Sequence, residues 1–131
     1  MEAYYHEKCA EAGTTGFCFM PPTDIMQILV ADDPDKAWAE LGKHFLHEAT
    51  TYAAWQTPDV HSIMHTHAES IDDLRAEGLY RILSPEECVA IAKEKGPGAA
   101  FGHHPLCGGM PIDAGWTSLE LYVNRVLPHV G

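Results

Sequence analysis

The sequence predicts an α/β protein with about three to four mostly parallel strands and helices between them. The apolar runs at 16–20 and 26–31 are continuous rather than alternating, which is typical of strands covered on both faces. The last four predicted elements alternate between strand and helix, as they do in α/β folds. A Gly-Gly loop follows the final strand, at the carboxyl end where such folds place their ligand sites.

Length and composition fit a single domain. With 131 residues, of which 46% are hydrophobic, the chain can bury about two-thirds of the surface that its unfolded form exposes. The formal net charge of −11 opposes binding to nucleic acid or to an anionic membrane surface, because phosphate contacts need clustered cations. We therefore expect neither among the partners.

The sequence shows no signal for a membrane or for secretion. No apolar run reaches the roughly 18 residues of a membrane span, and the N-terminus lacks a charged tip followed by an apolar segment. We expect a cytoplasmic protein. The cysteines are Cys9, Cys18, Cys88 and Cys107, which contain no CxxC pair that would indicate a zinc ribbon or a redox motif. Two disulfides are arithmetically open, but reduced thiols that fill apolar space are favoured.

The N-terminal part is predicted to hold one helix and two apolar runs. Residues 2–12 are rich in helix formers, with Gly13 placed as a C-terminal stop. The run at 16–20 ends at a pair of prolines, and the run at 26–31 ends at a pair of aspartates. The pattern leaves open whether these runs form one bent strand or two.

Asp33 and Pro34 predict the start of the longest helix, over about 34–56, because aspartate suits the N-cap and proline the first helical position. Its apolar positions recur at three- and four-residue steps, so one face should pack along a core. These positions are Ala37, Trp38, Leu41, Phe45, Ala49, Tyr52 and Ala53. Residues 57–69 predict a loop, and 70–77 a short helix that ends at Gly78.

The second half of the chain predicts two strand–helix pairs. Residues 79–83 form the first strand, and Ser84 with Glu87 predicts a capping box for a helix over 85–95. The second strand begins at Phe101. The last helix runs from about Pro111 to Pro128, and its hydrophobic residues recur at helical spacing. They are Ile112, Trp116, Leu119, Val123 and Val126.

Three stretches, taken in order, resemble the C-terminal part of luciferase-like flavin-dependent monooxygenases. They are 28–38 (ILVADDPDKAW), 83–88 (LSPEEC) and 105–111 (PLCGGMP), the last followed by SLEL at 118–121 and VLP at 126–128. The resemblance extends over nearly the whole chain. It implies part of an eight-stranded (β/α) barrel that binds FMN or a deazaflavin and uses the reduced flavin on small organic substrates.

The chain departs from this family in length. A complete barrel needs about 250 residues, so the resemblance implies a partial (β/α) barrel-like unit that lacks the first strands and most of the cofactor cavity. No catalytic residue is carried over. A partial barrel would expose unpaired strand edges and an apolar inner face. We therefore expect either a homodimer or a partner subunit that completes the sheet.

The loop after the final strand carries the candidate cofactor-binding residues, which are His103, His104, Cys107, Gly108 and Gly109. The two histidines would stand at a barrel rim, where they either face a ligand or make a structural hydrogen bond. The two glycines either let the backbone approach a phosphate near a helix N-terminus or only form a tight turn. Cys107 would be a nucleophile only with a lowered pKa, for which His104 is the sole indication.

Other histidines have weaker patterns. His61, His65 and His67 could hold a metal if their segment were helical, but helix caps are absent there, and a solvated loop is favoured. His44 and His47, with Glu48 adjacent, are interpreted as a solvated or interface feature rather than as an acid–base pair.

Three function classes follow from these patterns. The first is a flavin-linked oxidoreductase segment whose activity depends on a partner or on missing strands. The second is a non-catalytic module that binds a small molecule or another protein. The third is a small metal-dependent enzyme built on the histidines at 61, 65 and 67. A structured, shifted flavin spectrum would separate the first class from the second.

Overall fold

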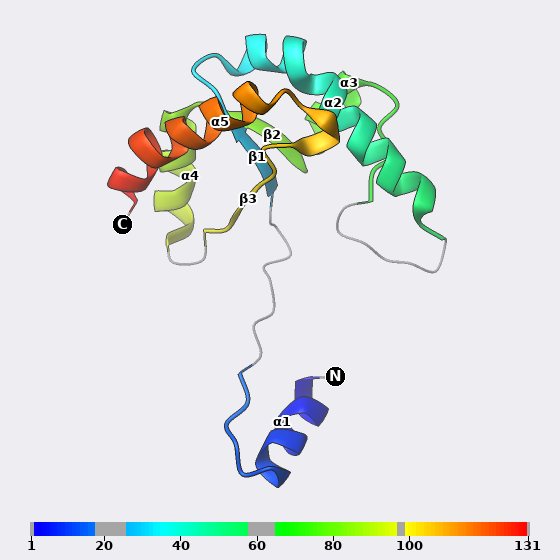
Figure 1. The fold of residues 1–131 in the computed structure, drawn as a ribbon, viewed down its shortest axis with the longest axis vertical. Helices are drawn as coiled ribbons and strands as arrows, with labels where there is room; N and C mark the ends of the chain where they lie inside the picture. The colour runs from blue at the N-terminus through cyan, green and yellow to red at the C-terminus, as the bar shows by residue number, and fades with distance from the viewer. Residues whose placement is uncertain (1, 18–25, 58–64, 97–98, 131) are drawn as a thin grey trace.

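The computed structural model describes residues 2–17, 26–57, 65–96 and 99–130 (Figure 1). Its strands are β1 (Met26–Val30), β2 (Tyr80–Leu83) and β3 (Phe101–His103). The helices are α1 (Glu2–Glu11), α2 (Pro34–Trp55), α3 (Ile71–Glu77), α4 (Pro85–Lys95) and α5 (Ile112–Leu121), with the short helical turns η2 (Cys107–Gly109), η3 (Tyr122–Val126) and η4 (Leu127–His129). The strands form one parallel sheet in the order β2-β1-β3. The predicted α/β class with three parallel strands is confirmed.

The strand order differs from the barrel-like arrangement that we predicted. A (β/α) barrel places consecutive strands side by side, whereas β1 here lies between the two strands that follow it. The physical reason is that the two crossovers pass over opposite faces. Helices α2 and α3 lie on one face between β1 and β2, and α4 lies on the other face and carries the chain to the far side of β1 (Figure 1). This is the winding of an open, doubly wound sheet.

Both faces of the sheet are buried, which explains the continuous apolar run of β1. Leu29 packs with Phe45 and Ile82 on the α2 face. Ile28 and Val30 point to the opposite face, because successive strand residues alternate, and they pack there with Leu83, Cys88 and Val126. β1 is the central strand, and its buried side chains Ile28, Leu29 and Val30 divide between the two cores.

Helix α2 begins as its sequence predicts. Asp33 Oδ1 accepts a hydrogen bond from Lys36 N at 3.0 Å, and Pro34 occupies the first turn. The predicted inward row is buried or, at Leu41, half-buried as far as Ala49, but Tyr52 is 49% exposed. Beyond that point α2 extends away from the sheet, so its last turns have no core to pack against (Figure 1).

The starts of α3 and α4 are fixed by local capping. At α4, Ser84 Oγ accepts from Glu87 N at 3.1 Å, and Glu87 Oε2 accepts from Ser84 N at 2.8 Å, which confirms the predicted capping box. Ser70 forms the corresponding box at α3. That helix ends at Gly78, whose φ of 73° is the left-handed conformation that suits glycine.

Strand β3 is short, and helix α5 replaces its missing continuation. Val30 N points toward the side of β1 on which β3 lies. Strand β3 ends at His103, which pairs with Ile28, so it does not reach Val30. The Ser118 hydroxyl accepts the hydrogen bond from Val30 N at 2.7 Å instead. A buried backbone donor is thereby satisfied by a side chain. This bond attaches α5 to the centre of the sheet.

The hydrophobic row predicted on the last helix mostly faces outward. Val126 is fully buried, but Ile112, Trp116 and Val123 are between 54% and 65% exposed. The buried positions of α5 are Gly115 and Ser118. Small residues allow the helix to approach the rest of the chain closely, so the larger apolar side chains remain on its outer face.

The N-terminal helix α1 forms where the sequence predicts it, but it buries no residue. In the predicted strand at 16–20, Gly16 and Phe17 are not in a strand, and the remaining positions lie outside the described residues. Cys9, Cys88 and Cys107 are free thiols, as predicted, while Cys18 also lies outside. None of the helices in the described ranges combines the length and apolar character that a bilayer crossing requires.

Candidate functional site

A largely buried carboxylate on α2 joins the chain segments around the Gly-Gly loop. The side chain of Glu48 is 11% exposed, and its Oε2 accepts a hydrogen bond from Gly108 N at 3.1 Å. Its Oε1 accepts from His104 Nδ1 at 3.1 Å, and the Tyr80 hydroxyl lies 3.4 Å from the same oxygen. A carboxylate only accepts, so His104 carries its proton on Nδ1 in this arrangement. Glu48 thus connects α2, β2 and η2.

The fourth group at this carboxylate is the thiol of Cys107. Cys107 is fully buried and forms a hydrogen bond with Glu48. Burial, followed by the charge of Glu48, raises the pKa of Cys107 far above its ordinary value. The thiol is therefore protonated at neutral pH, and the nucleophile that we considered at this position is disfavoured, because the thiolate is the reactive form.

Glycine is the only residue type that fits at position 108. Its φ is 55°, and a Cβ built there would lie 1.9 Å from the carbonyl oxygen of His44. This close approach is held by a hydrogen bond of 3.1 Å between His44 Nδ1 and the Gly108 carbonyl. The carbonyl only accepts, so Nδ1 is the donor. Helix α2 and turn η2 therefore contact each other through backbone atoms.

The two glycines have different surroundings. The amide of Gly108 is used by Glu48, and that negative carboxylate opposes an anion at the same point. Gly109 is exposed, and no atom of the described residues lies within 4 Å of a Cβ built on it. Of the pair, Gly109 is thus the glycine that an external ligand can approach.

The two adjacent histidines point to opposite faces of the sheet. His104 lies with Glu48 on the α2 face. His103 packs against Tyr122, with 4.2 Å between ring centroids, and its Nε2 is buried without a hydrogen-bond partner among the described residues. Burial lowers the pKa of His103, which keeps its ring neutral. Of the five predicted site residues, the structure therefore brings together His104, Cys107 and Gly108, and His103 lies apart.

His65 and His67, from the predicted three-histidine group, make local contacts. His65 Nδ1 lies 2.7 Å from Gln56 Oε1, and its ring meets that of His67 edge-on with 4.5 Å between centroids. His61 lies outside the described residues, so the three-histidine hypothesis stays a prediction.

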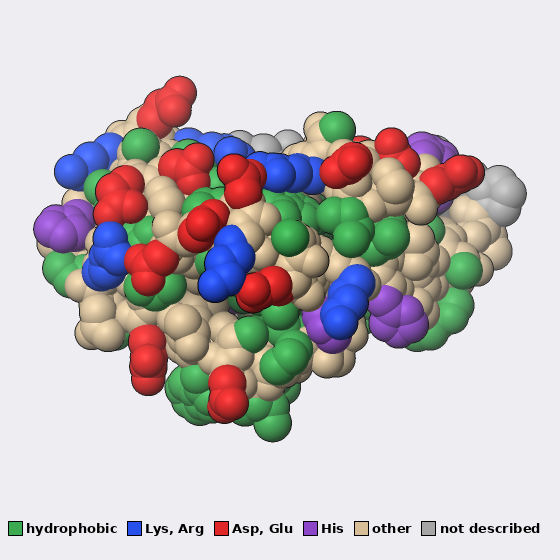
Figure 2. All heavy atoms as spheres, turned by 90° about the horizontal axis from the view of Figure 1, so that it is seen from above, with side chains coloured by type: hydrophobic (Ala, Val, Ile, Leu, Met, Phe, Trp, Pro, Cys, Tyr) green, Lys and Arg blue, Asp and Glu red, His purple; other side chains and the backbone are tan. Residues whose placement is uncertain are grey.

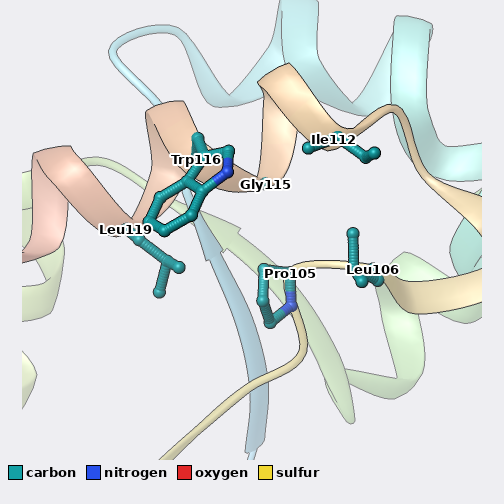
Figure 3. Close-up of a pocket in the computed structure, with 6 residues that line it drawn as sticks. All are labelled: Pro105, Leu106, Ile112, Gly115, Trp116 and Leu119. Carbon is teal, nitrogen blue, oxygen red and sulfur yellow. The ribbon is translucent and has the colours of Figure 1, made fainter.

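An apolar groove lies between α5 and the segment that links β3 to η2 (Figure 3). Its volume is about 200 Å³, and it is lined by Pro105, Leu106, Ile112, Gly115, Trp116 and Leu119. Figure 3 shows Trp116 and Leu119 of α5 on one side and Pro105 and Leu106 on the other. A Cβ on Gly115 would lie 2.3 Å from the Pro105 carbonyl oxygen, so this glycine sets how close the helix comes.

The edge where the strands end is crossed by ion pairs. Arg125 contacts Asp32, which follows β1, and Glu86, which lies in the first turn of α4 after β2. The pKa of Glu86 is lowered by its hydrogen bonds, to a backbone N–H and to Arg125. Seen from above the sheet, acidic and basic side chains are interspersed around gathered hydrophobic ones (Figure 2). This face therefore has no single sign of charge.

Glu48 and Tyr80 are the residues whose roles sequence reasoning missed. One signal was present for Glu48: it lies three residues after Phe45 and four before Tyr52, which places its carboxylate beside the apolar face of α2. No comparable signal marks Tyr80.

Comparisons with protein-family models, with curated proteins and with solved structures found no match for this chain.

Proposed function

We propose that the chain is a flavin-linked oxidoreductase segment, similar to the C-terminal part of a luciferase-like monooxygenase, that acts together with a second copy or a partner subunit. One observation carries this proposal. The stretches at 28–38, 83–88 and 105–111 each include or follow the C-terminal end of one of the three parallel strands. Parallel strands end at the same edge, so the three stretches gather where α/β folds bind ligands.

The size of the groove supports a shared site. Its volume of about 200 Å³ is below the roughly 300–1,000 Å³ of typical small-molecule sites. FMN or a deazaflavin would therefore need walls from another chain.

His104 and Gly109 are the residues through which this chain would contact the flavin. Both are exposed after the end of β3. Cys107 and Gly108 would act behind them, because both are held by Glu48. A buried thiol and an engaged amide position the loop without touching the ligand.

A second copy of the chain is the partner that this surface favours. Between positions 101 and 124 the sequence has two charged residues, Asp113 and Glu120, among nineteen acids and eight Lys and Arg in total. Repulsion from the net charge of −11 is therefore weak at α5. Exposed apolar side chains such as Trp116, together with an edge strand, β3, in the described sheet, favour association.

Light scattering after size-exclusion chromatography, combined with FMN titration, tests the proposal. We expect a dimer at micromolar concentration and a structured, shifted flavin spectrum that follows the dimer population. A monomer at all concentrations would contradict the self-association. A dimer that leaves the FMN spectrum unchanged at high micromolar flavin would contradict the flavin role.

The second candidate is a non-catalytic module that binds another protein. The outward apolar row on α5 favours it, because such rows on monomeric proteins commonly mark interaction surfaces. This candidate predicts association without flavin binding, so the same titration separates the two.

A further inference from the structure

We propose that Glu48, His104 and Cys107 form a binding site for a divalent transition metal ion, best suited to zinc. The three residues come from α2, from the segment after β3 and from η2. Their ligand atoms all lie within 4.8 Å of one another. This inference does not rest on the proposed flavin function.

The spacing of the three donor atoms fits a tetrahedral ion. Bonds of roughly 2.0–2.3 Å place neighbouring ligand atoms about 3.3–3.7 Å apart around zinc. His104 Nδ1 and Glu48 Oε1 are already 3.1 Å apart. Small side-chain movements would bring all three donors onto one ion.

The donor set selects the class of metal. A cysteine sulfur and an imidazole nitrogen are ligands of zinc and its neighbours in the first transition series, whereas calcium and magnesium take oxygen ligands. Three protein ligands leave a fourth position for water or a substrate, as in catalytic zinc sites. Calcium and magnesium should therefore compete poorly.

The surroundings hold the ligands in place. Gly108 N donates to one oxygen of Glu48, and the Tyr80 hydroxyl lies beside the other. His44 fixes the loop through the Gly108 carbonyl. Groups that hydrogen-bond a metal ligand in this way orient it and typically change metal affinity by about 10- to 100-fold.

The site has a path from solvent. Cys107 is fully buried and Glu48 is 11% exposed, whereas the side chain of His104 is 45% exposed. An ion would enter on the His104 side, and its fourth ligand would face solvent there. When the sulfur–metal bond forms, the Cys107 thiol releases its proton to water. His104 would bind through Nδ1 and move its proton to Nε2, which remains available to a neighbouring ligand.

Cobalt(II) titration of the full chain, in physiological salt with excess magnesium, tests this site. We expect one ion per chain, tetrahedral visible bands and a thiolate-to-cobalt charge-transfer band that zinc removes. Cys107→Ser should abolish the charge-transfer band. His104→Ala changes a half-exposed side chain, so the fold should persist by circular dichroism, and affinity should fall at least 10-fold. Cys88→Ala, which removes a buried thiol on the opposite face, is the matched control and should bind like wild type.

Three results would overturn the proposal. The first is the absence of a charge-transfer band in the wild-type protein. The second is a band that persists in Cys107→Ser. The third is a folded His104→Ala variant that binds cobalt as tightly as the wild type.

Discussion

The Glu48 carboxylate accepts a hydrogen bond from the Gly108 amide 3.1 Å away and so joins α2 to η2 across sixty positions of sequence. Around this bond lie His104, Tyr80 and Cys107. The folded position of the Gly-Gly loop therefore depends on one largely buried carboxylate, Glu48. We make four predictions about stability, two from this loop, one from α5 and one from the core on the opposite face.

Glu48→Ala should destabilise the protein by about 2–4 kcal/mol, because it leaves the Gly108 amide and the buried Cys107 thiol without an acceptor. Urea unfolding monitored by circular dichroism measures the change. Glu40→Ala on the same helix removes only an exposed pair with Lys36 and should stay within about 0.5 kcal/mol of wild type. Equal effects of the two substitutions would show that Glu48 does not organise the loop.

Gly108→Ala and Gly109→Ala form a matched pair. Both residues have positive φ, 55° and 75°, so each alanine should cost about 1–2 kcal/mol for the left-handed conformation. Gly108→Ala should cost at least about 2 kcal/mol more, because its Cβ would lie 1.9 Å from the His44 carbonyl oxygen. The difference in unfolding free energy is the test, and similar values for the two variants would contradict the close contact of η2 with α2.

Ser118→Ala should destabilise the fold by about 1–3 kcal/mol, because it removes the acceptor for a buried backbone donor, Val30 N. Thr117→Ala is the control. It loses a hydrogen bond to the carbonyl of Asp113 on the exposed side of the helix and should change stability by less than about 0.5 kcal/mol. If Ser118→Ala behaved like this control, Val30 would need another partner.

The stability of the protein should fall above pH 9 in part through Cys88. Burial, with a smaller contribution from Glu87, raises the pKa of Cys88 from 9.0 to about 11. Because the pKa is higher in the folded state, only the unfolded state loses the Cys88 proton between pH 9 and 11. The stability that the buried thiol contributes is therefore complete below pH 9, and about 2 kcal/mol of it is lost as the pH rises to 11. Between pH 8 and 11 the unfolding free energy of wild type should therefore fall by about 2 kcal/mol more than that of Cys88→Ala, so that the two curves converge. Parallel curves would be inconsistent with a buried thiol.

Local chemistry made much of this fold predictable from the sequence. The N-cap at Asp33, the capping box at Ser84 and the stop at Gly78 each depend on residues within a few positions, and all three are present. The existence and direction of helix α4 follow from the same kind of signal. The continuous apolar run before Asp32 correctly indicated a strand buried on both faces.

Long-range contacts were not predictable. The order β2-β1-β3 depends on which face each crossover covers, and no residue pattern within one helix specifies that choice. The hydrophobic row of α5 has helical spacing, but whether it faces inward depends on the small residues Gly115 and Ser118 meeting the loop and the sheet. Tyr80 meets Glu48 from 32 positions away. The sequence pointed to the Gly-Gly loop as part of the candidate site, but it did not point to Glu48, whose carboxylate holds that loop.

The most direct test of the functional account is FMN titration of wild type, Trp116→Glu and Trp55→Glu, with the oligomeric state of each sample measured by light scattering. Both tryptophans are exposed, at 60% and 71%, but only Trp116 lies on the apolar row of α5. We predict a dimer with a structured flavin spectrum for wild type and Trp55→Glu, and a monomer with the spectrum of free FMN for Trp116→Glu. A Trp116→Glu monomer that binds FMN as well as wild type, or a wild-type dimer that leaves the spectrum unchanged, would contradict a flavin site shared between two chains.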